Sequence, residues 1–173
     1  INPGILFLLE NVRMKKEHQD IISSYLGVEP IKINSALVSA QNRSRLYWTN
    51  IPFEMPTDKN LVLKDIFAGG VNITERVLNK SADTLAYKKC HGHTVSLNSK
   101  ARCLLTGGQQ VSNSGATNIK IGREYFTLSP LECERLQTLP DNYTEGLSNS
   151  ARYKCIGNGW TVDVIAHIFK GIK

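Results

Sequence analysis

Two short polar groups in this sequence combine residue types that can do acid–base chemistry and bind carbonyl oxygens. Glu10 and Asn11 follow the apolar run Ile5–Leu9, and Arg43 and Arg45 stand one residue apart. A carboxyl group held in an apolar pocket at a strand end can donate or accept a proton. An arginine keeps its charge and offers several donors to a carbonyl, a carboxylate or a phosphate. The alternatives are a capping or surface-paired carboxylate at Glu10 and two surface arginines on an edge strand.

A third candidate is the glycine-containing segment Gly157-Asn158-Gly159-Trp160, which precedes an apolar helical pattern. We expect its glycines to form a turn that opens the last helix, where backbone amides favour anionic groups. An ordinary helix start with a buried Trp160 is the alternative.

Thiol and imidazole groups lie close together at Cys90, His91 and His93, with Cys103 further along. Both are zinc ligands, but the spacing matches no standard zinc module and no second close pair follows. The segment is therefore interpreted as a polar hairpin, and no metal is expected.

The charge is unevenly distributed along the 173 residues, whose net charge is +6. Eight basic and three acidic side chains lie between residues 71 and 126, so this stretch carries most of the surplus. Such a segment is the electrostatic footprint expected of a nucleic-acid surface, and a solvated charged face is the open alternative.

The composition indicates a globular domain, because 41% of the residues are hydrophobic and 21% are charged. No apolar run is long enough for a membrane helix, so no membrane span is expected. The four cysteines lack tight disulfide spacing, which favours reduced thiols in the cytoplasm. The apolar start without Met resembles the middle of a protein.

The first third of the chain has an α/β pattern. Ile5–Leu9 is expected to be a strand buried on both faces of a parallel sheet. A helix over Lys15–Leu26, stopped by Gly27, would follow, and then strands over Ile31–Val38 and Arg45–Ile51.

Further along, a short helix is expected over Val62–Phe67, followed by a polar, loop-rich region over Asn79–Lys120 with a strand-like piece at Ala101–Thr106. Ser129-Pro130-Leu131-Glu132 has the residue types of a helix start, and this helix should run to Leu139. A last helix is expected over Thr161–Ile172.

Four segments, in this order, resemble conserved blocks of the DNA (cytosine-5) methyltransferases. They are Phe7–Val12 with Glu-Asn-Val, Gln41–Arg45 with Gln-x-Arg-x-Arg, Leu128–Pro140, and Gly157–Val162. Val38-Ser39-Ala40 and Trp160 look like the de novo type, whereas the short connections resemble compact bacterial and phage members of restriction–modification systems.

The resemblance implies a Rossmann-like α/β sheet with a small, loop-rich target-recognition domain inserted. Residues 1–53 would be the second half of the catalytic domain, 54–126 the target-recognition region, and 127–173 helices returning to the catalytic domain. The activity implied is methyl transfer from S-adenosylmethionine to carbon 5 of a cytosine flipped out of double-stranded DNA.

The resemblance also implies a role for each candidate residue of the base pocket. Glu10 would protonate N3 of the cytosine, Arg45 would contact its O2, and Arg43 would order Glu10 or bind a backbone phosphate. Asn11 and Gln41 would shape the adjoining turns.

The remaining candidates bind DNA or cofactor. Lys100 and Arg102, with the flexible glycines Gly107 and Gly108, are the candidates for DNA contact. Asn158, Gly159 and Trp160 would close one wall of the S-adenosylmethionine pocket.

Two family features are absent from the sequence. It has no glycine-rich loop after a first strand, and no cysteine follows a proline. We therefore expect the C-terminal part of a bacterial or phage-encoded methyltransferase, inactive without an N-terminal half in the same or another chain. The alternative is a non-catalytic DNA-binding subunit or a remnant of a split enzyme.

Overall fold

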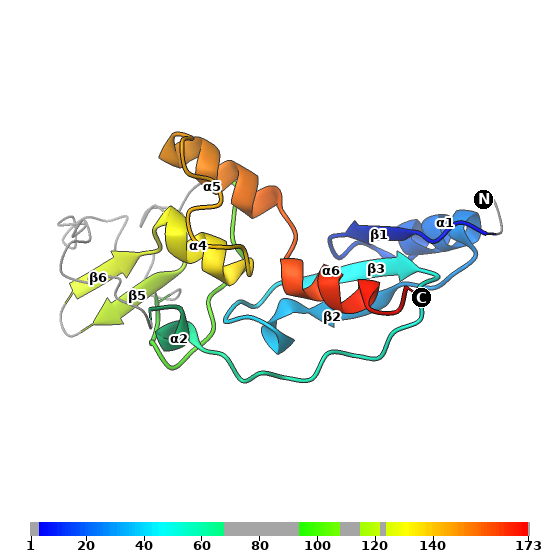
Figure 1. The fold of residues 1–173 in the computed structure, drawn as a ribbon, viewed down its shortest axis with the longest axis horizontal. Coiled ribbons are helices and arrows are strands. Elements are labelled where there is room, and N and C mark those ends of the chain that lie inside the picture. Colours follow the sequence, from blue (N-terminus) through cyan, green and yellow to red (C-terminus); the bar gives the residue numbers. More distant parts are fainter. Residues whose placement is uncertain (1–3, 68–93, 108–114, 122–123, 173) are drawn as a thin grey trace.

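The computed structural model describes residues 4–67, 94–107, 115–121 and 124–172 of the chain. Figure 1 shows two groups of elements side by side along the long axis. The first, here the sheet lobe, contains strands β1 (Leu8–Asn11), β2 (Ile31–Asn34) and β3 (Ser44–Thr49) with helices α1 (Lys16–Leu26) and α6 (Val162–Phe169). The second, here the small lobe, contains helices α2 (Leu63–Phe67), α4 (Pro130–Leu136) and α5 (Asn149–Asn158) and strands β4 (Thr94–Val95), β5 (Asn118–Ile121) and β6 (Glu124–Thr127).

The strand order of the sheet lobe is β1-β3-β2, and the central strand β3 runs antiparallel to both neighbours. The prediction that Ile5–Leu9 is a strand buried on both faces of a parallel sheet is therefore wrong in pairing direction, in bounds and in burial. β1 begins at Leu8 and lies at an edge of the described sheet, with Leu9 38% exposed. A continuous apolar run by itself does not say whether both faces of a strand are covered.

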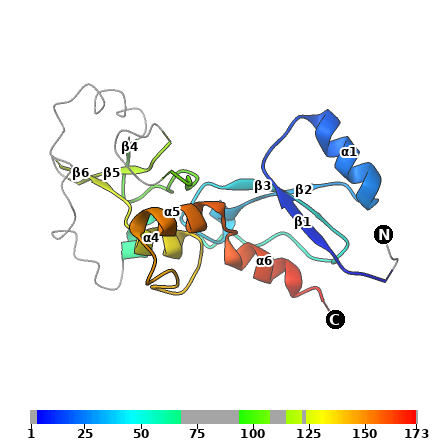
Figure 2. The same ribbon diagram turned by 90° about the horizontal axis from the view of Figure 1, so that it is seen from above.

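The two helices of the sheet lobe cover opposite faces of the sheet (Figure 2). Trp48 on β3 donates from Nε1 to Ser23 of α1, at 3.0 Å. On the other face, Tyr47 and Ile33 share a core cluster with residues of α6. Alternate residues of β3 thus face different helices, as the period of a strand requires.

Local signals in the sequence explain several boundaries. The prediction of α1 is confirmed, and the helix ends where Gly27 adopts a left-handed conformation with φ 74°. β2 is shorter than predicted, because Asn34 begins the 3-10 turn Ser35–Leu37 and its side chain accepts a bond from the Ala36 amide. Asparagine side chains compete in this way with a strand ladder.

The small lobe has its own core. One buried cluster contains Leu63 of α2, Ile119 of β5, Leu136 of α4 and Ile156 of α5, together with Leu128, which precedes α4. α4 and α5 therefore pack in the small lobe, while α6 packs on the sheet (Figure 1). The division of the chain at residues 53/54 and 126/127 stays a prediction.

The helix start at Ser129 is confirmed as a capping box, in which Ser129 and Glu132 each bond the backbone amide of the other. The helix ends at Leu136, three residues before the predicted end. The strand expected over Ala101–Thr106 is wrong: Ala101 forms only an isolated bridge with Gln41, whose segment belongs to the sheet lobe. Within the described residues, no helix is long and apolar enough to cross a membrane.

Candidate functional site

Glu10 and Arg45 form an ion pair at the carboxyl end of β1. Arg45 Nε lies 2.9 Å from Glu10 Oε1, and the two side chains are only 15% and 14% exposed. β1 and β3 are neighbours, and Glu10 stands opposite Tyr47 in the register, so both partners lie on the α6 face of the sheet. The expectation of an apolar pocket around Glu10 is corrected: a guanidinium group faces the carboxylate.

Arg43 is the more buried arginine, 4% exposed. Its Nη2 donates to the carbonyl oxygens of Gly159, at 2.8 Å, and Gly157, at 3.3 Å. Burial lowers the pKa of its guanidinium, and the nearby charge of Arg45 lowers it further. The expectation that Arg43 orders Glu10 is corrected, because Arg45 makes that contact and Arg43 instead holds the backbone at the end of α5.

Both guanidinium groups reach one thiol. Arg43 Nη1 lies 3.4 Å and Arg45 Nη2 3.7 Å from Sγ of Cys103. The prediction that the two arginines point the same way is therefore confirmed. Cys103 was not expected in this cluster, since only the three-dimensional fold brings residue 103 to the sheet.

Gln41 is fully buried and connects the two lobes. Its Nε2 donates to the Leu136 carbonyl, at 3.2 Å, and to Gln137 Oε1, at 3.3 Å, while its Oε1 accepts from the Leu104 amide at 2.9 Å. Gln137 donates in turn to the carbonyl of Gly159 at 3.1 Å, the oxygen that also binds Arg43. The side-chain amides of Gln41 and Gln137 therefore both bond groups within the protein.

Two members of this network, Gln137 and Thr161, were not predicted from the sequence. Thr161 Oγ1 donates to Gln137 Oε1 at 2.8 Å and accepts from the hydroxyl of Ser35 at the same distance. Only the position of Gln137 three residues before Pro140, within the matched block Leu128–Pro140, could have pointed to it.

The segment expected to form a turn before the last helix is helical instead. Gly157 and Asn158 form the end of α5, and Gly159 caps it. A Cβ at Gly157 would lie 2.7 Å from the Leu105 backbone, so close packing explains this glycine better than a turn does. Asn158 is exposed and Trp160 is 47% exposed, which corrects the alternative of a buried Trp.

The side chain of Asn11 forms a hydrogen bond with the backbone of the next residue. Its Oδ1 accepts from the Val12 amide at 2.8 Å, an interaction that fixes the backbone directly after Glu10.

The candidates for DNA contact lie in different environments. The expectation that Lys100 contacts DNA is corrected. Its ammonium group donates to three backbone carbonyl oxygens, those of Ala36 at 2.6 Å, Leu61 at 2.8 Å and Ser39 at 3.3 Å. These bonds connect the two lobes, and they occupy all three N–H donors of the ammonium group, so none is left for a phosphate. Arg102 is half-buried, with its amide bonded to Thr117, and Gly107 is exposed. Gly108 lies outside the described residues.

Cys90, His91 and His93 also lie outside the described residues. In the part of the chain that the structure describes, no group of three or more His, Cys, Asp or Glu side chains could hold a metal ion.

The sequence profile of the C-5 cytosine-specific DNA methylases matches residues 2–173. The chain belongs to this family. A type II methyltransferase of Staphylococcus aureus, M.Sau3AI, is 40% identical over 80 residues, which cover 46% of this chain and 19% of that protein.

Solved structures of methyltransferases share the fold of this family member. Entamoeba histolytica EhMeth superimposes with a TM-score of 0.69 at 15% identity, over 97% of this chain and 63% of that one. S. pombe Dnmt2 superimposes with a TM-score of 0.67 at 15% identity, and the match covers 95% of this chain and 64% of the Dnmt2 chain. The expected α/β, Rossmann-like methyltransferase fold is thereby confirmed, and the chain spans less than two thirds of either solved chain.

Proposed function

We propose that this C-5 methylase chain acts in methyl transfer to carbon 5 of cytosine in double-stranded DNA. The observation that carries the proposal is the Glu10–Arg45 ion pair, 2.9 Å across and mostly shielded from solvent, at the carboxyl end of β1. Ligands of open α/β sheets bind at this end of the strands. The type II methyltransferase M.Sau3AI supports a place in restriction–modification.

The chemistry of cytosine explains the need for this pair. Carbon 5 becomes nucleophilic only after a thiolate adds at carbon 6, and the addition moves negative charge to N3 and O2. These two atoms lie on one edge of the ring. Glu10 in its protonated form gives that proton to N3 and becomes the carboxylate that pairs with Arg45, while Arg45 donates a hydrogen bond to O2, so neighbouring side chains serve neighbouring atoms.

S-adenosylmethionine is the methyl donor that we propose, in keeping with the family resemblance. It supplies the methyl group that carbon 5 attacks. Asn158 and Trp160 fit one wall of its pocket, because an exposed amide and an exposed indole lie two residues apart beside Gly159.

The nucleophilic thiolate of the family follows a proline, and none of the four cysteines here does. We propose that a further segment, in the same or another chain, carries the Pro-Cys pair and the glycine-rich loop. The edge strand β1 supports this proposal, since Leu6 and Leu9 beside that edge are 48% and 38% exposed. An exposed apolar strand edge is a surface for pairing.

Glu10→Gln tests the proposed role in the complete enzyme. The amide keeps the shape of the side chain but has no acid proton to give, so we expect turnover to fall about 10²- to 10⁴-fold. DNA affinity should change little. Methylation is measured with a radiolabelled methyl donor, and affinity by fluorescence anisotropy.

Glu17→Gln, on the exposed side of α1, is the matched control and should keep full turnover. If Glu10→Gln lowered DNA affinity and left turnover unchanged, Glu10 would be a binding residue, and the chain would fit a DNA-binding subunit better.

A further inference from the structure

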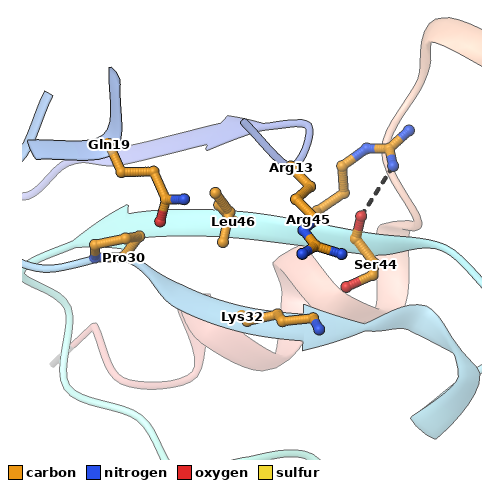
Figure 3. A pocket seen from close by; sticks show the side chains of 7 residues that line it. All are labelled: Arg13, Gln19, Pro30, Lys32, Ser44, Arg45 and Leu46. Atoms are coloured by element: carbon orange, nitrogen blue, oxygen red, sulfur yellow. Dashed lines mark hydrogen bonds between the residues drawn. The ribbon is translucent and has the colours of Figure 1, made fainter. Parts of the chain in front are cut away.

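A pocket of about 350 Å³ lies on the α1 face of the sheet, the face opposite to Glu10, and Arg45 contributes to its lining. Figure 3 shows the side-chain ends of Arg13 and Lys32 and the hydroxyl of Ser44 facing a common space, with Leu46 beside them. None of the seven residues that line the pocket is acidic. The pocket is therefore suited to an anion.

The two cations at the pocket are available to a ligand. Arg13 and Lys32 are exposed, and in the described part of the chain neither side chain forms a hydrogen bond or an ion pair. By contrast, Lys16 on α1 pairs with Asp20, at 2.6 Å, and with Glu29, at 3.4 Å. An unpaired arginine–lysine couple around one space attracts anions with more than one oxygen.

The protein holds this couple in place. Gln19 of α1 donates from Nε2 to the Met14 carbonyl at 2.8 Å, which fixes the loop that carries Arg13. Lys32 is paired with Leu46 in the register of β2 and β3, so its backbone is fixed as well. A ligand would thus meet two cations on ordered backbone.

A third group at the pocket lacks a partner. The hydroxyl of Ser44 is buried and has no hydrogen bond among the described residues. A buried polar atom without a partner is unfavourable, so the unpaired hydroxyl between two cations points to a bound group in the working state. A phosphate, with several acceptor oxygens, could use all three groups.

Arg45 connects the pocket to the candidate active site. It lines the pocket, donates from Nη1 to the Ser44 carbonyl at 3.0 Å (Figure 3), and pairs through Nε with Glu10. We propose that Arg13, Lys32 and Ser44 bind a backbone phosphate of the DNA strand whose cytosine enters the Glu10–Arg45 site. This inference rests on the proposed function, since it assigns a contact to the same substrate.

The test is a scan of single neutral methylphosphonate linkages along a duplex that contains the target cytosine. In the wild-type complete enzyme, one linkage near the cytosine should weaken binding about tenfold, because it removes one charge-assisted contact. The double variant Arg13→Gln/Lys32→Gln should bind unmodified DNA about tenfold more weakly and should be insensitive to that linkage. Its affinity should also fall less steeply with salt, by about one unit of the log–log slope.

The matched control is Lys170→Gln, which removes an exposed cation beyond the end of α6 and should leave the linkage effect unchanged. Ser44→Ala should weaken binding without changing the salt slope.

Two results would overturn the inference and leave the proposed function intact. The first is a double variant that binds and methylates DNA as the wild type does, with the same linkage sensitivity. The second is a pocket that binds inorganic phosphate, seen by NMR shifts that the double variant loses, without any effect of that variant on DNA affinity. If the wild type bound no DNA at all, the proposed function would fail first, and the inference with it.

Discussion

Two arginines separated by one residue have different roles in this chain. Arg45 faces Glu10 and stays half-buried, whereas Arg43 is 4% exposed and donates to two backbone carbonyls. A guanidinium cannot lose its proton at neutral pH, so a buried arginine needs acceptors on every side. The carbonyl oxygens at the end of α5 supply them.

Arg43→Met tests this role through stability. Methionine has a similar length but no donor, so the carbonyl oxygens of Gly157 and Gly159 lose a partner inside the protein. We expect the free energy of unfolding to fall by about 1–3 kcal/mol in urea titrations. Lys170→Met, at an exposed position, should change nothing. An equally stable or more stable Arg43→Met would mean that desolvation of the guanidinium outweighs its hydrogen bonds.

The position of helix α4 is fixed by the buried carboxylate of Glu134. Glu134 accepts from the amides of Asn142 and Thr144, from Arg152 Nη2, each at 2.9 Å, and from the Thr144 hydroxyl. Burial alone would raise the pKa of this carboxyl, but the bonds from Thr144 and Arg152 hold the pKa below its ordinary value of 4.5. These bonds connect α4 to α5 and to the turn between them.

This lowered pKa predicts a pH dependence. Because the folded chain binds the proton less tightly than the unfolded chain, the stabilisation is complete above pH 4.5 and is lost as the pH falls toward the folded-state pKa. Glu134→Gln should cost about 2–4 kcal/mol at pH 7 and should flatten the fall of unfolding free energy in acid. Glu17→Gln, exposed on α1, should keep the wild-type slope; an unchanged acid slope in Glu134→Gln would contradict the assignment.

The elements that the sequence predicted well are those with local end signals. Gly27 ends α1, and Ser129 with Glu132 starts α4. α5 was missed because few of its residues are buried, so it has no apolar stripe, and because Gly157 and Gly159 suggest a turn. The antiparallel pair of β5 and β6 was missed because each strand is only four residues long, too short for a clear alternating pattern.

The same limit applies to the candidate site. Residue types and the family blocks identified Glu10, Arg43 and Arg45, but which arginine pairs with Glu10 depends on the register of β1 against β3. Cys103 contacts Arg43 although the two residues are 60 positions apart in the sequence, so no local sequence pattern could predict this contact.

Buried polar contacts join the two lobes of the molecule. Gln41 of the sheet lobe bonds Leu104 and Leu136 of the small lobe, and Lys100 of the small lobe bonds Ala36 and Ser39 of the sheet lobe. Such contacts fix orientation more strictly than apolar packing does, because hydrogen bonds are directional. The arginines of the site are thereby held in a fixed position relative to the small lobe.

We propose that this chain supplies the base pocket and that the attacking thiolate comes from another segment. The most direct measurement is covalent trapping on duplex DNA containing 5-fluorocytosine, with S-adenosylmethionine, with and without the segment that carries the Pro-Cys pair. Fluorine blocks the final elimination, so the attacking cysteine stays bonded to the base. We expect no adduct with this chain alone and an adduct on the added segment in the mixture. An adduct on this chain alone, above all at Cys103 beside Arg43 and Arg45, would contradict the claim.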